Sequence, residues 1–204
     1  MLSCLGSDNI NHVDIYNNNQ QNKVYLLGDE GVGKSNITNC LLGMSFKKKK
    51  NKRTGIFSDT LKVNENFSIV LKTICDTKDY RYTKKIRNHI QEVKGIIIVF
   101  SLIDKNSFDK AKELINFILE YINNEELYII LVGNKSDLVK EDENKVELSD
   151  ISEMLIQIPN SCYYEVSCLN KINIDRLKRE IINLNFDEEI QLFLDEGIDR
   201  DRSN

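Results

Sequence analysis

One stretch of the sequence combines the residue types that bind phosphate groups. Residues 28–35, GDEGVGKS, match the pattern GxxxxGK[ST] between an apolar run and a helical segment. Glycines let the backbone curl so that successive N–H groups and a helix N-terminus face the phosphates, while the lysine supplies a cation and the serine holds a magnesium ion. We therefore predict that a nucleotide contacts Asp29, Glu30, Gly31, Val32, Gly33, Lys34, Ser35 and Asn36.

A second motif selects the base. The sequence NKSD, which contains Asn134, Lys135 and Asp137, follows shortly after an apolar strand along the chain. Guanine presents two donors, its ring N1–H and its exocyclic amine, and a fixed Asp137 carboxylate can accept both. Asn134 would brace the loops, and Lys135 would lie along the base. The two motifs together predict a guanine nucleotide as the ligand, and they make an ATP-dependent kinase or motor the weaker interpretation.

These motifs are similar to those of the Ras superfamily of small GTPases, with the Rab branch nearest, over about Lys23 to Leu184. The resemblance implies a GTP/GDP switch with bound Mg²⁺ that hydrolyses GTP and recruits protein effectors or regulators. It assigns partner binding to two switch segments, Phe46 to Thr54 and Asp76 to Arg87. Membrane trafficking is the association that it implies most often.

The resemblance also implies further site residues. Phe46 corresponds to the aromatic that covers the guanine edge, although a phenylalanine there could equally pack in the core. Thr54 is the best match to the threonine that binds the metal, with Thr60 as second choice, and Asp76 would support magnesium through water. Where relatives carry a Ser-Ala-Lys loop that contacts guanine, this chain has Ser167, Cys168 and Leu169.

The second switch departs from the family pattern. After Asp76 and Thr77, Lys78 replaces alanine, Asp79 replaces a glycine that contacts the γ-phosphate, and Tyr80 stands where a water-orienting glutamine is expected. The carboxylate would repel the terminal phosphate. No catalytic residue is assigned, and we expect very slow intrinsic hydrolysis. The same departure leaves open a pseudo-GTPase, which would hold nucleotide as a structural ligand and serve as a protein-interaction module.

The hydrophobic pattern predicts the elements that position these motifs. Apolar runs without polar alternation are typical of buried parallel strands, and they cover Lys23–Leu27, Gly95–Leu102, Leu127–Val132 and Tyr163–Val166. Two alternating runs, Ile56–Val63 and Phe67–Cys75, predict a hairpin. Helical spacing predicts helices at Asn36–Leu42, Ser107–Ile122, Ser149–Ile158 and Ile174–Leu184.

In the second of these helices, Ser107 is the expected N-cap, and Leu119 is expected on the apolar stripe with Phe108 and Ile115. Strands and helices alternate along the chain. We therefore predict an α/β fold of the P-loop NTPase, small-GTPase type: an open, mostly parallel six-stranded sheet with one antiparallel edge strand and helices on both faces.

The chain divides into three expected parts. Residues 1–22 include an Asn/Gln stretch and are expected to form a disordered polar tail. Residues 23–184 form the nucleotide-binding domain, and residues 185–204 form an acidic extension that is partly helical or disordered. Within the first switch, the basic run Lys47 to Arg53 is either a solvated loop or a docking site for an acidic partner or an anionic lipid surface.

Composition limits the partners and the compartment. The net charge of −4 predicts no general affinity for nucleic acid. The five cysteines form no CxxC pair and are expected to be buried reduced thiols, as in the cytosol. The longest apolar run, Gly95 to Ile103, is too short to cross a membrane, and no cysteine follows Cys168 for C-terminal prenylation. We expect a cytoplasmic monomer that reaches endomembranes only peripherally or through a partner.

Overall fold

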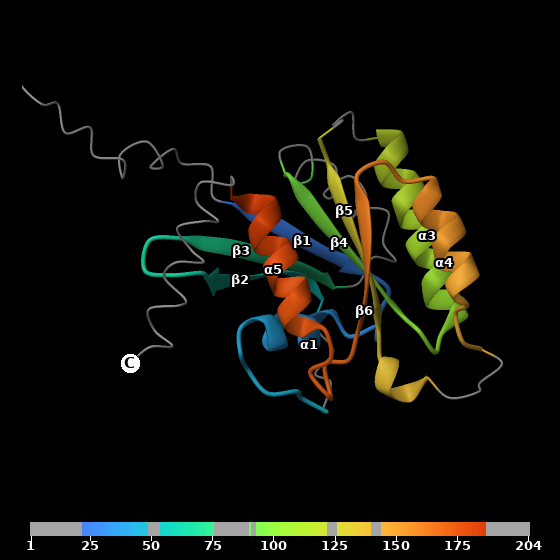
Figure 1. Ribbon diagram of the computed structural model, residues 1–204, viewed down its shortest axis with the longest axis horizontal. Coiled ribbons are helices and arrows are strands. Elements are labelled where there is room, and N and C mark those ends of the chain that lie inside the picture. Colours follow the sequence, from blue (N-terminus) through green and yellow to red (C-terminus); the bar gives the residue numbers. More distant parts are fainter. Residues whose placement is uncertain are drawn as a thin grey trace, which may run out of the picture.

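The computed structural model describes residues 22–48, 54–75, 90, 93–121, 126–139 and 144–186. Within these residues, one six-stranded sheet has the strand order β2-β3-β1-β4-β5-β6 (Figure 1). Only the edge strand β2 runs antiparallel to its neighbour. The predicted fold class is confirmed. The strands are β1 Lys23–Gly28, β2 Gly55–Lys62, β3 Ser68–Cys75, β4 Gly95–Ser101, β5 Tyr128–Asn134 and β6 Ser161–Val166.

The parallel register brings the functional motifs to one edge of the sheet. Gly28, the last residue of β1, pairs with Val99 of β4. Ser101, the last residue of β4, pairs with Asn134, and Asn134 pairs with Val166 at the end of β6. The loops that follow β1, β5 and β6 therefore emerge side by side, where open α/β sheets bind ligands.

Helices cover both faces of the sheet, and each face has its own apolar core. Helices α1 (Lys34–Leu41) and α5 (Ile174–Asn185) pack on one face through residues such as Ile37 and Leu177. Helices α3 (Lys105–Tyr121) and α4 (Leu148–Ile156) lie on the other (Figure 1). There the rings of Phe100 and Phe108 lie 4.9 Å apart. Burying each such side chain stabilises the fold by about 1.5–3 kcal/mol.

The start of α3 differs from the prediction. Helix α3 begins at Lys105, and Asp104 precedes it and accepts a hydrogen bond from Ser107 N through Oδ1 at 3.3 Å. Ser107 lies inside the first turn, where its hydroxyl donates to the Asp104 oxygen at 2.7 Å and accepts from Ser101 N at 2.9 Å. The prediction of Ser107 as the cap was wrong, because the aspartate three residues earlier already satisfies the helix N-terminus.

The apolar stripe of α3 is narrower than predicted. Ile118 is fully buried, whereas its neighbour Leu119 remains 40% exposed. One position along a helix rotates a side chain by about 100° around the axis, which carries Leu119 off the buried face. The buried residues of the helix are Ser107, Phe108, Ala111, Ile115 and Ile118.

Several element boundaries shift by one or two residues. Strand β5 continues through Gly133 and Asn134, because these residues still pair with Glu165 and Val166 of β6. Helix α5 continues to Asn185, whose side-chain amide donates to the Ile181 oxygen at 2.7 Å. Asn185 and Phe186 are buried, so they pack with the domain although the sequence placed them in the acidic extension. Of the predicted tails, 1–22 and 185–204, residues 1–21 and 187–204 lie outside the described residues.

Of the thiols in the described part of the chain, Cys40, Cys75 and Cys168 are buried and Cys162 is half-buried, and all four are free. Cys4 lies outside that part. No described helix combines the length and the apolar character that a membrane span requires.

Candidate nucleotide-binding site

The phosphate loop connects β1 directly to the N-terminus of α1. Gly33 is the residue before the helix, with φ of 106°, and its oxygen accepts the N–H groups of Asn36 and Ile37 at 2.9 and 3.0 Å. A β-carbon at Gly33 would lie 2.2 Å from Nδ2 of Asn134. Both the backbone conformation and the close approach therefore require glycine at this position.

Lys34 is held at the base of this loop. Its side chain is only 6% exposed, and its ammonium donates to the main-chain oxygens of Gly28 at 2.9 Å and Asp29 at 2.7 Å. A buried ammonium is tolerated when such oxygens satisfy it. The positive charge is thus fixed beside the helix N-terminus, and together they suit the outer phosphates of a nucleotide.

The base-reading segment is tied to the phosphate loop by one buried amide. Asn134 ends β5 and is 3% exposed, and its Nδ2 donates to the Val32 oxygen at 2.9 Å. Lys135 then takes a left-handed backbone conformation, with φ of 68°, before the short 3₁₀ helix η2 (Ser136–Leu138). The two sequence motifs, which lie about a hundred residues apart in the chain, therefore form one site.

Asp137 is positioned by the loop that follows β6. The buried hydroxyl of Ser167 donates to Oδ1 of Asp137 at 2.5 Å and accepts from the N–H of Asn170 at 3.1 Å. Main-chain hydrogen bonds in both directions between Ser167 and Ile172 close this loop. A carboxylate held in this way keeps a fixed orientation, as recognition of two neighbouring donors on guanine requires.

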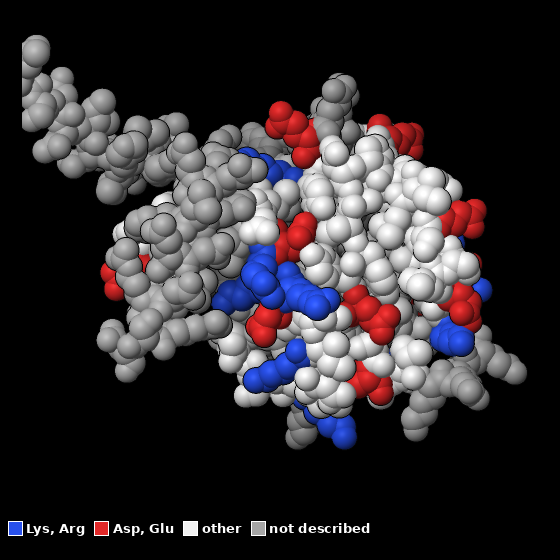
Figure 2. Space-filling model, viewed as in Figure 1, with Lys and Arg blue, Asp and Glu red and all other residues white. Residues whose placement is uncertain are grey.

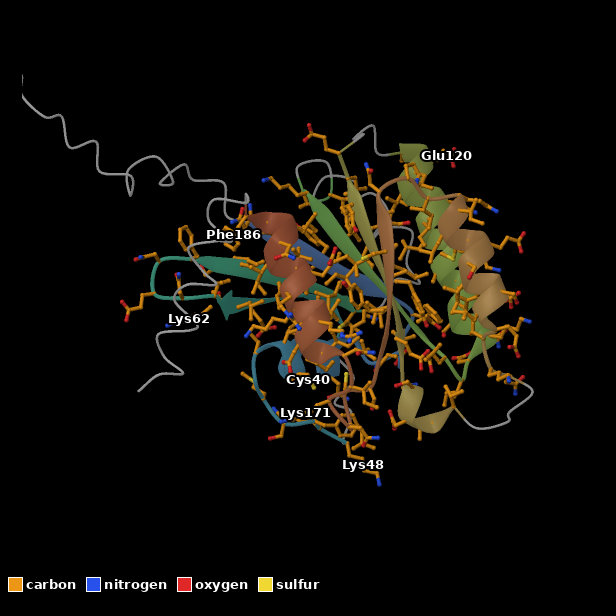
Figure 3. All side chains as sticks on the ribbon, in the orientation of Figure 1. Cys40, Lys48, Lys62, Glu120, Lys171 and Phe186 are labelled. Carbon is orange, nitrogen blue, oxygen red and sulfur yellow. The ribbon has the colours of Figure 1, made fainter. Side chains whose placement is uncertain are left out.

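Cys168 adds a contact that the family's alanine could not make. Its thiol donates to Oδ1 of Asn134 at 3.6 Å, and its main-chain oxygen accepts from the Cys40 thiol, also at 3.6 Å. Burial raises the pKa of both thiols, so they remain protonated donors at neutral pH. Cys40 and Lys171 lie near the start of α5, and Phe186 lies near its other end (Figure 3). Leu169 is 54% exposed.

The segment after α1 is held by a reciprocal pair of hydrogen bonds. The Asn36 side chain donates to the Lys47 oxygen at 3.4 Å and accepts from Lys47 N at 3.3 Å. This places Phe46, which is half-buried and packs against the core shared by α1 and α5. Lys47 and Lys48 are exposed, and the rest of the basic run lies outside the described residues.

The predicted metal ligands are only partly described. Ser35 and Thr54 are exposed, and Asp76 lies outside the described residues, as do Asp79 and Tyr80. Hydroxyl and carboxylate oxygens are ligands that Mg²⁺ accepts. Over the described ranges, no cluster of three or more His, Cys, Asp or Glu side chains could hold a metal ion by itself.

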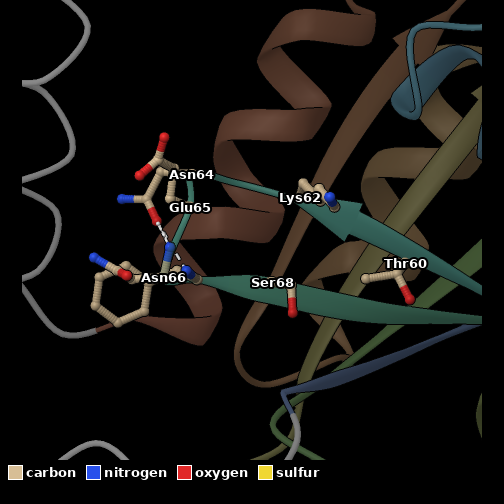
Figure 4. Close-up of a pocket in the computed structure, with 7 residues that line it drawn as sticks. Thr60, Lys62, Asn64, Glu65, Asn66 and Ser68 are labelled. Carbon is tan, nitrogen blue, oxygen red and sulfur yellow. Dashed lines mark hydrogen bonds between the residues drawn. The ribbon is translucent and has the colours of Figure 1, made fainter. Parts of the chain in front are cut away.

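The strand register places Thr60 too far from the phosphate loop to be a metal ligand. Thr60 pairs with Val70, and Val70 pairs with Lys23, the first residue of β1. Thr60 therefore lies level with the start of β1, far along the sheet from the phosphate loop. It lines a pocket of about 400 Å³ at the β2–β3 hairpin with Lys62, Asn64 and Phe67 (Figure 4). This pocket is distinct from the nucleotide site.

One residue of the site was missed from the sequence. The ammonium of Lys110, on α3, lies 2.6 Å from Oδ2 of Asp29 in the phosphate loop. Lys110 is not among the residues of the predicted apolar stripe, and nothing in its spacing connects it with residue 29. Elsewhere on the surface, positive and negative side chains are interspersed on the face where α5 lies (Figure 2).

Comparisons with known proteins agree with this geometry. The Ras family profile matches residues 23–185. The Ras-like protein rasU of Dictyostelium discoideum is 29% identical over 179 residues, which are 82% of this chain and 78% of that protein. The GTP-binding protein YPT53 of Saccharomyces cerevisiae is 28% identical over 156 residues, 74% of this chain and 70% of that protein.

The human GTP-binding protein GEM is 33% identical over 123 residues, which are 58% of this chain and 41% of that protein. The family profile extends over both sequence motifs and over all the strands and helices that carry them. This chain belongs to the Ras family of small GTP-binding proteins.

Proposed function

We propose that this protein is a Rab-like GTP/GDP switch that hydrolyses GTP very slowly. The observation that carries the proposal is the Asn134–Val32 hydrogen bond of 2.9 Å, because it joins a phosphate-binding loop to a guanine-reading segment. The relatives rasU and YPT53, described as Ras-like and GTP-binding, support the same reading.

The site residues have separate roles in this proposal. The loop residues Asp29 to Asn36 surround the phosphates, Lys34 supplies the cation, and Asp137 accepts from guanine. Lys135 and Phe46 border the base, with the loop Ser167, Cys168 and Leu169 beside it. Ser35 and Thr54 would hold Mg²⁺ directly and Asp76 through water, and the bound ion would neutralise charge on the outer phosphates.

Partner binding follows from the same family membership. Effectors or regulators would contact the segments Phe46 to Thr54 and Asp76 to Arg87, as in a switch that serves intracellular trafficking. The protein would act as a cytoplasmic monomer, without nucleic acid, and would reach endomembranes peripherally or through a partner. These assignments rest on the resemblance and on the net charge of −4.

A pseudo-GTPase is the second candidate, and one specific observation favours it. Asp79 and Tyr80 stand where the family uses glycine and glutamine to sense the γ-phosphate and orient water. In that case the nucleotide would stabilise the fold, and the protein would act as a binding module. The two candidates share the nucleotide site and differ only in turnover.

Quantifying the nucleotide that co-purifies with the protein, followed by single-turnover GTP hydrolysis with Mg²⁺, separates the candidates. Lys34→Ala and Asp137→Ala serve as binding-deficient variants. The switch predicts bound guanine nucleotide and conversion of GTP to GDP at or below about 10⁻⁴ per second, the order of an intact site of this type without a partner. Bound nucleotide without any turnover supports the pseudo-GTPase, and a wild-type protein that binds neither GTP nor GDP refutes both.

A further inference from the structure

An ion pair connects the phosphate loop to the side of α3. The Lys110 ammonium donates to Oδ2 of Asp29 at 2.6 Å, at the short limit for a charge-assisted hydrogen bond between an ammonium and a carboxylate. The Asp29 side chain is only 12% exposed, whereas that of Lys110 is 47% exposed. Hydrogen bonding to Asp29 is the largest cause of the raised pKa of Lys110, so the ammonium of Lys110 stays protonated at neutral pH.

Asp29 also contacts the phosphate-binding lysine through its main chain. Its carbonyl oxygen accepts from Nζ of Lys34 at 2.7 Å. Asp29 therefore contacts Lys34 through its main chain and Lys110 through its carboxylate. If the charge of Lys110 were removed, the poorly solvated carboxylate would attract the Lys34 ammonium more strongly and would repel the phosphates.

We infer that Lys110 is a positioning residue for nucleotide binding, which holds the Asp29 carboxylate toward α3 and leaves the Lys34 charge to the phosphates. This inference rests on the proposed function. It assigns to α3, a helix that carries none of the family's nucleotide motifs, a direct influence on how long the nucleotide stays bound. The influence is electrostatic, so charge rather than shape at residue 110 should determine it.

The test is the dissociation rate of a fluorescent GDP analogue from the purified full-length protein in Mg²⁺. Lys110→Ala is expected to release the analogue about fivefold faster, the upper end for a partly exposed ion pair. Lys110→Arg, which keeps the charge, is expected to stay within twofold of wild type, by the same small scale of exposed pairs. Lys112→Ala is the matched control, because the Lys112 ammonium lies over the Phe108 ring at 4.6 Å on the same helix.

Two further measurements separate the electrostatic role from a merely structural one. In an Asp29→Asn background, Lys110→Ala is expected to change the release rate no further, because the carboxylate is gone. Raising the salt concentration to about 1 M shortens the Debye length to roughly 3 Å, and the ratio between wild type and Lys110→Ala should shrink. Circular dichroism of each variant confirms that it is folded.

The outcomes are distinguishable. Equal release from wild type and Lys110→Ala, or the same acceleration in the Asp29→Asn background, overturns this inference and leaves the proposed function standing. A wild-type protein that retains no guanine nucleotide overturns the proposed function and this inference with it.

Discussion

The side chain of Asn134 joins three loops at once: its Nδ2 donates to the Val32 oxygen at 2.9 Å, and its Oδ1 accepts from the Cys168 thiol at 3.6 Å. The amide is buried, so each of these groups would lack water as an alternative partner. The geometry of the phosphate loop and of the base-reading segment therefore depends on the same side chain.

Asn134→Ala is expected to lower the free energy of unfolding by about 1–3 kcal/mol, because it leaves the buried Val32 oxygen without this donor. Urea unfolding of the nucleotide-free protein measures it. Asn66→Ala is the control, since Asn66 is exposed on the hairpin and donates to Asn64 through its main-chain N–H, which the substitution keeps. Equal midpoints for the two variants would contradict the prediction.

Gly33→Ala is expected to destabilise the protein more than Gly43→Ala. Both glycines have positive φ, but a β-carbon at Gly33 would lie 2.2 Å from Asn134 Nδ2, whereas a β-carbon at Gly43 would have open space around it beyond its two chain neighbours, within the described part of the chain. Backbone strain alone costs about 1–2 kcal/mol in each variant. Thermal or urea unfolding of the pair isolates the cost of the steric overlap, and equal losses would show that Asn134 can move aside.

Ser167→Ala is expected to weaken GDP binding about tenfold, because a hydrogen bond to a charged group contributes at least about 1.5 kcal/mol. The hydroxyl donates to Asp137 at 2.5 Å and fixes the carboxylate that is proposed to accept from guanine. Titration calorimetry measures the dissociation constant. Ser152→Ala is the control, since that hydroxyl bonds only the Leu148 oxygen on the surface of α4 among the contacts described.

Stability is expected to fall as the pH rises above 9. Burial is the largest cause that raises the pKa of Cys162 from 9.0 to about 11 and that of Tyr164 from 10.0 to about 12. The nearby Glu180 carboxylate also raises both values. The folded state therefore keeps these protons after the unfolded chain has lost them, so the free energy of unfolding decreases with pH between these values.

Urea midpoints at pH 8 and pH 11 test this dependence. Tyr164→Phe removes the hydroxyl that donates to Glu180 at 2.9 Å, and its unfolding free energy should therefore change less with pH than that of wild type. An identical pH dependence in the variant would show that Tyr164 does not contribute.

Much of the fold could be predicted because its signals are local. The apolar strands and the motifs GDEGVGKS and NKSD lie within short stretches whose residue types have one dominant physical meaning. Element ends were less predictable, since β5 continues through Gly133 and Asn134 because both β4 and β6 pair with them. Ser107 was mistaken for a cap because both it and Asp104 suit that role by type.

The site beyond its motifs depends on contacts between distant residues. Neither the spacing nor the type of Lys110 points to Asp29, and the two meet because α3 packs beside β1. Likewise, the thiol of Cys168 contacts Asn134 because β5 and β6 pair. Such relations arise from the three-dimensional arrangement, which a single sequence does not display.

The strand order also determines when the site can exist during synthesis of the chain. The phosphate-binding residues are made early, but Gly28 pairs with Val99 of β4, and Asp137 is held by Ser167. A nascent chain that has left the ribosome only as far as β4 therefore contains the phosphate-loop residues but lacks Asn134, the side chain that ties this loop to the base-reading segment. The loop after β6, which holds Asp137, emerges later still, so the base side of the site is the last part of it to be completed.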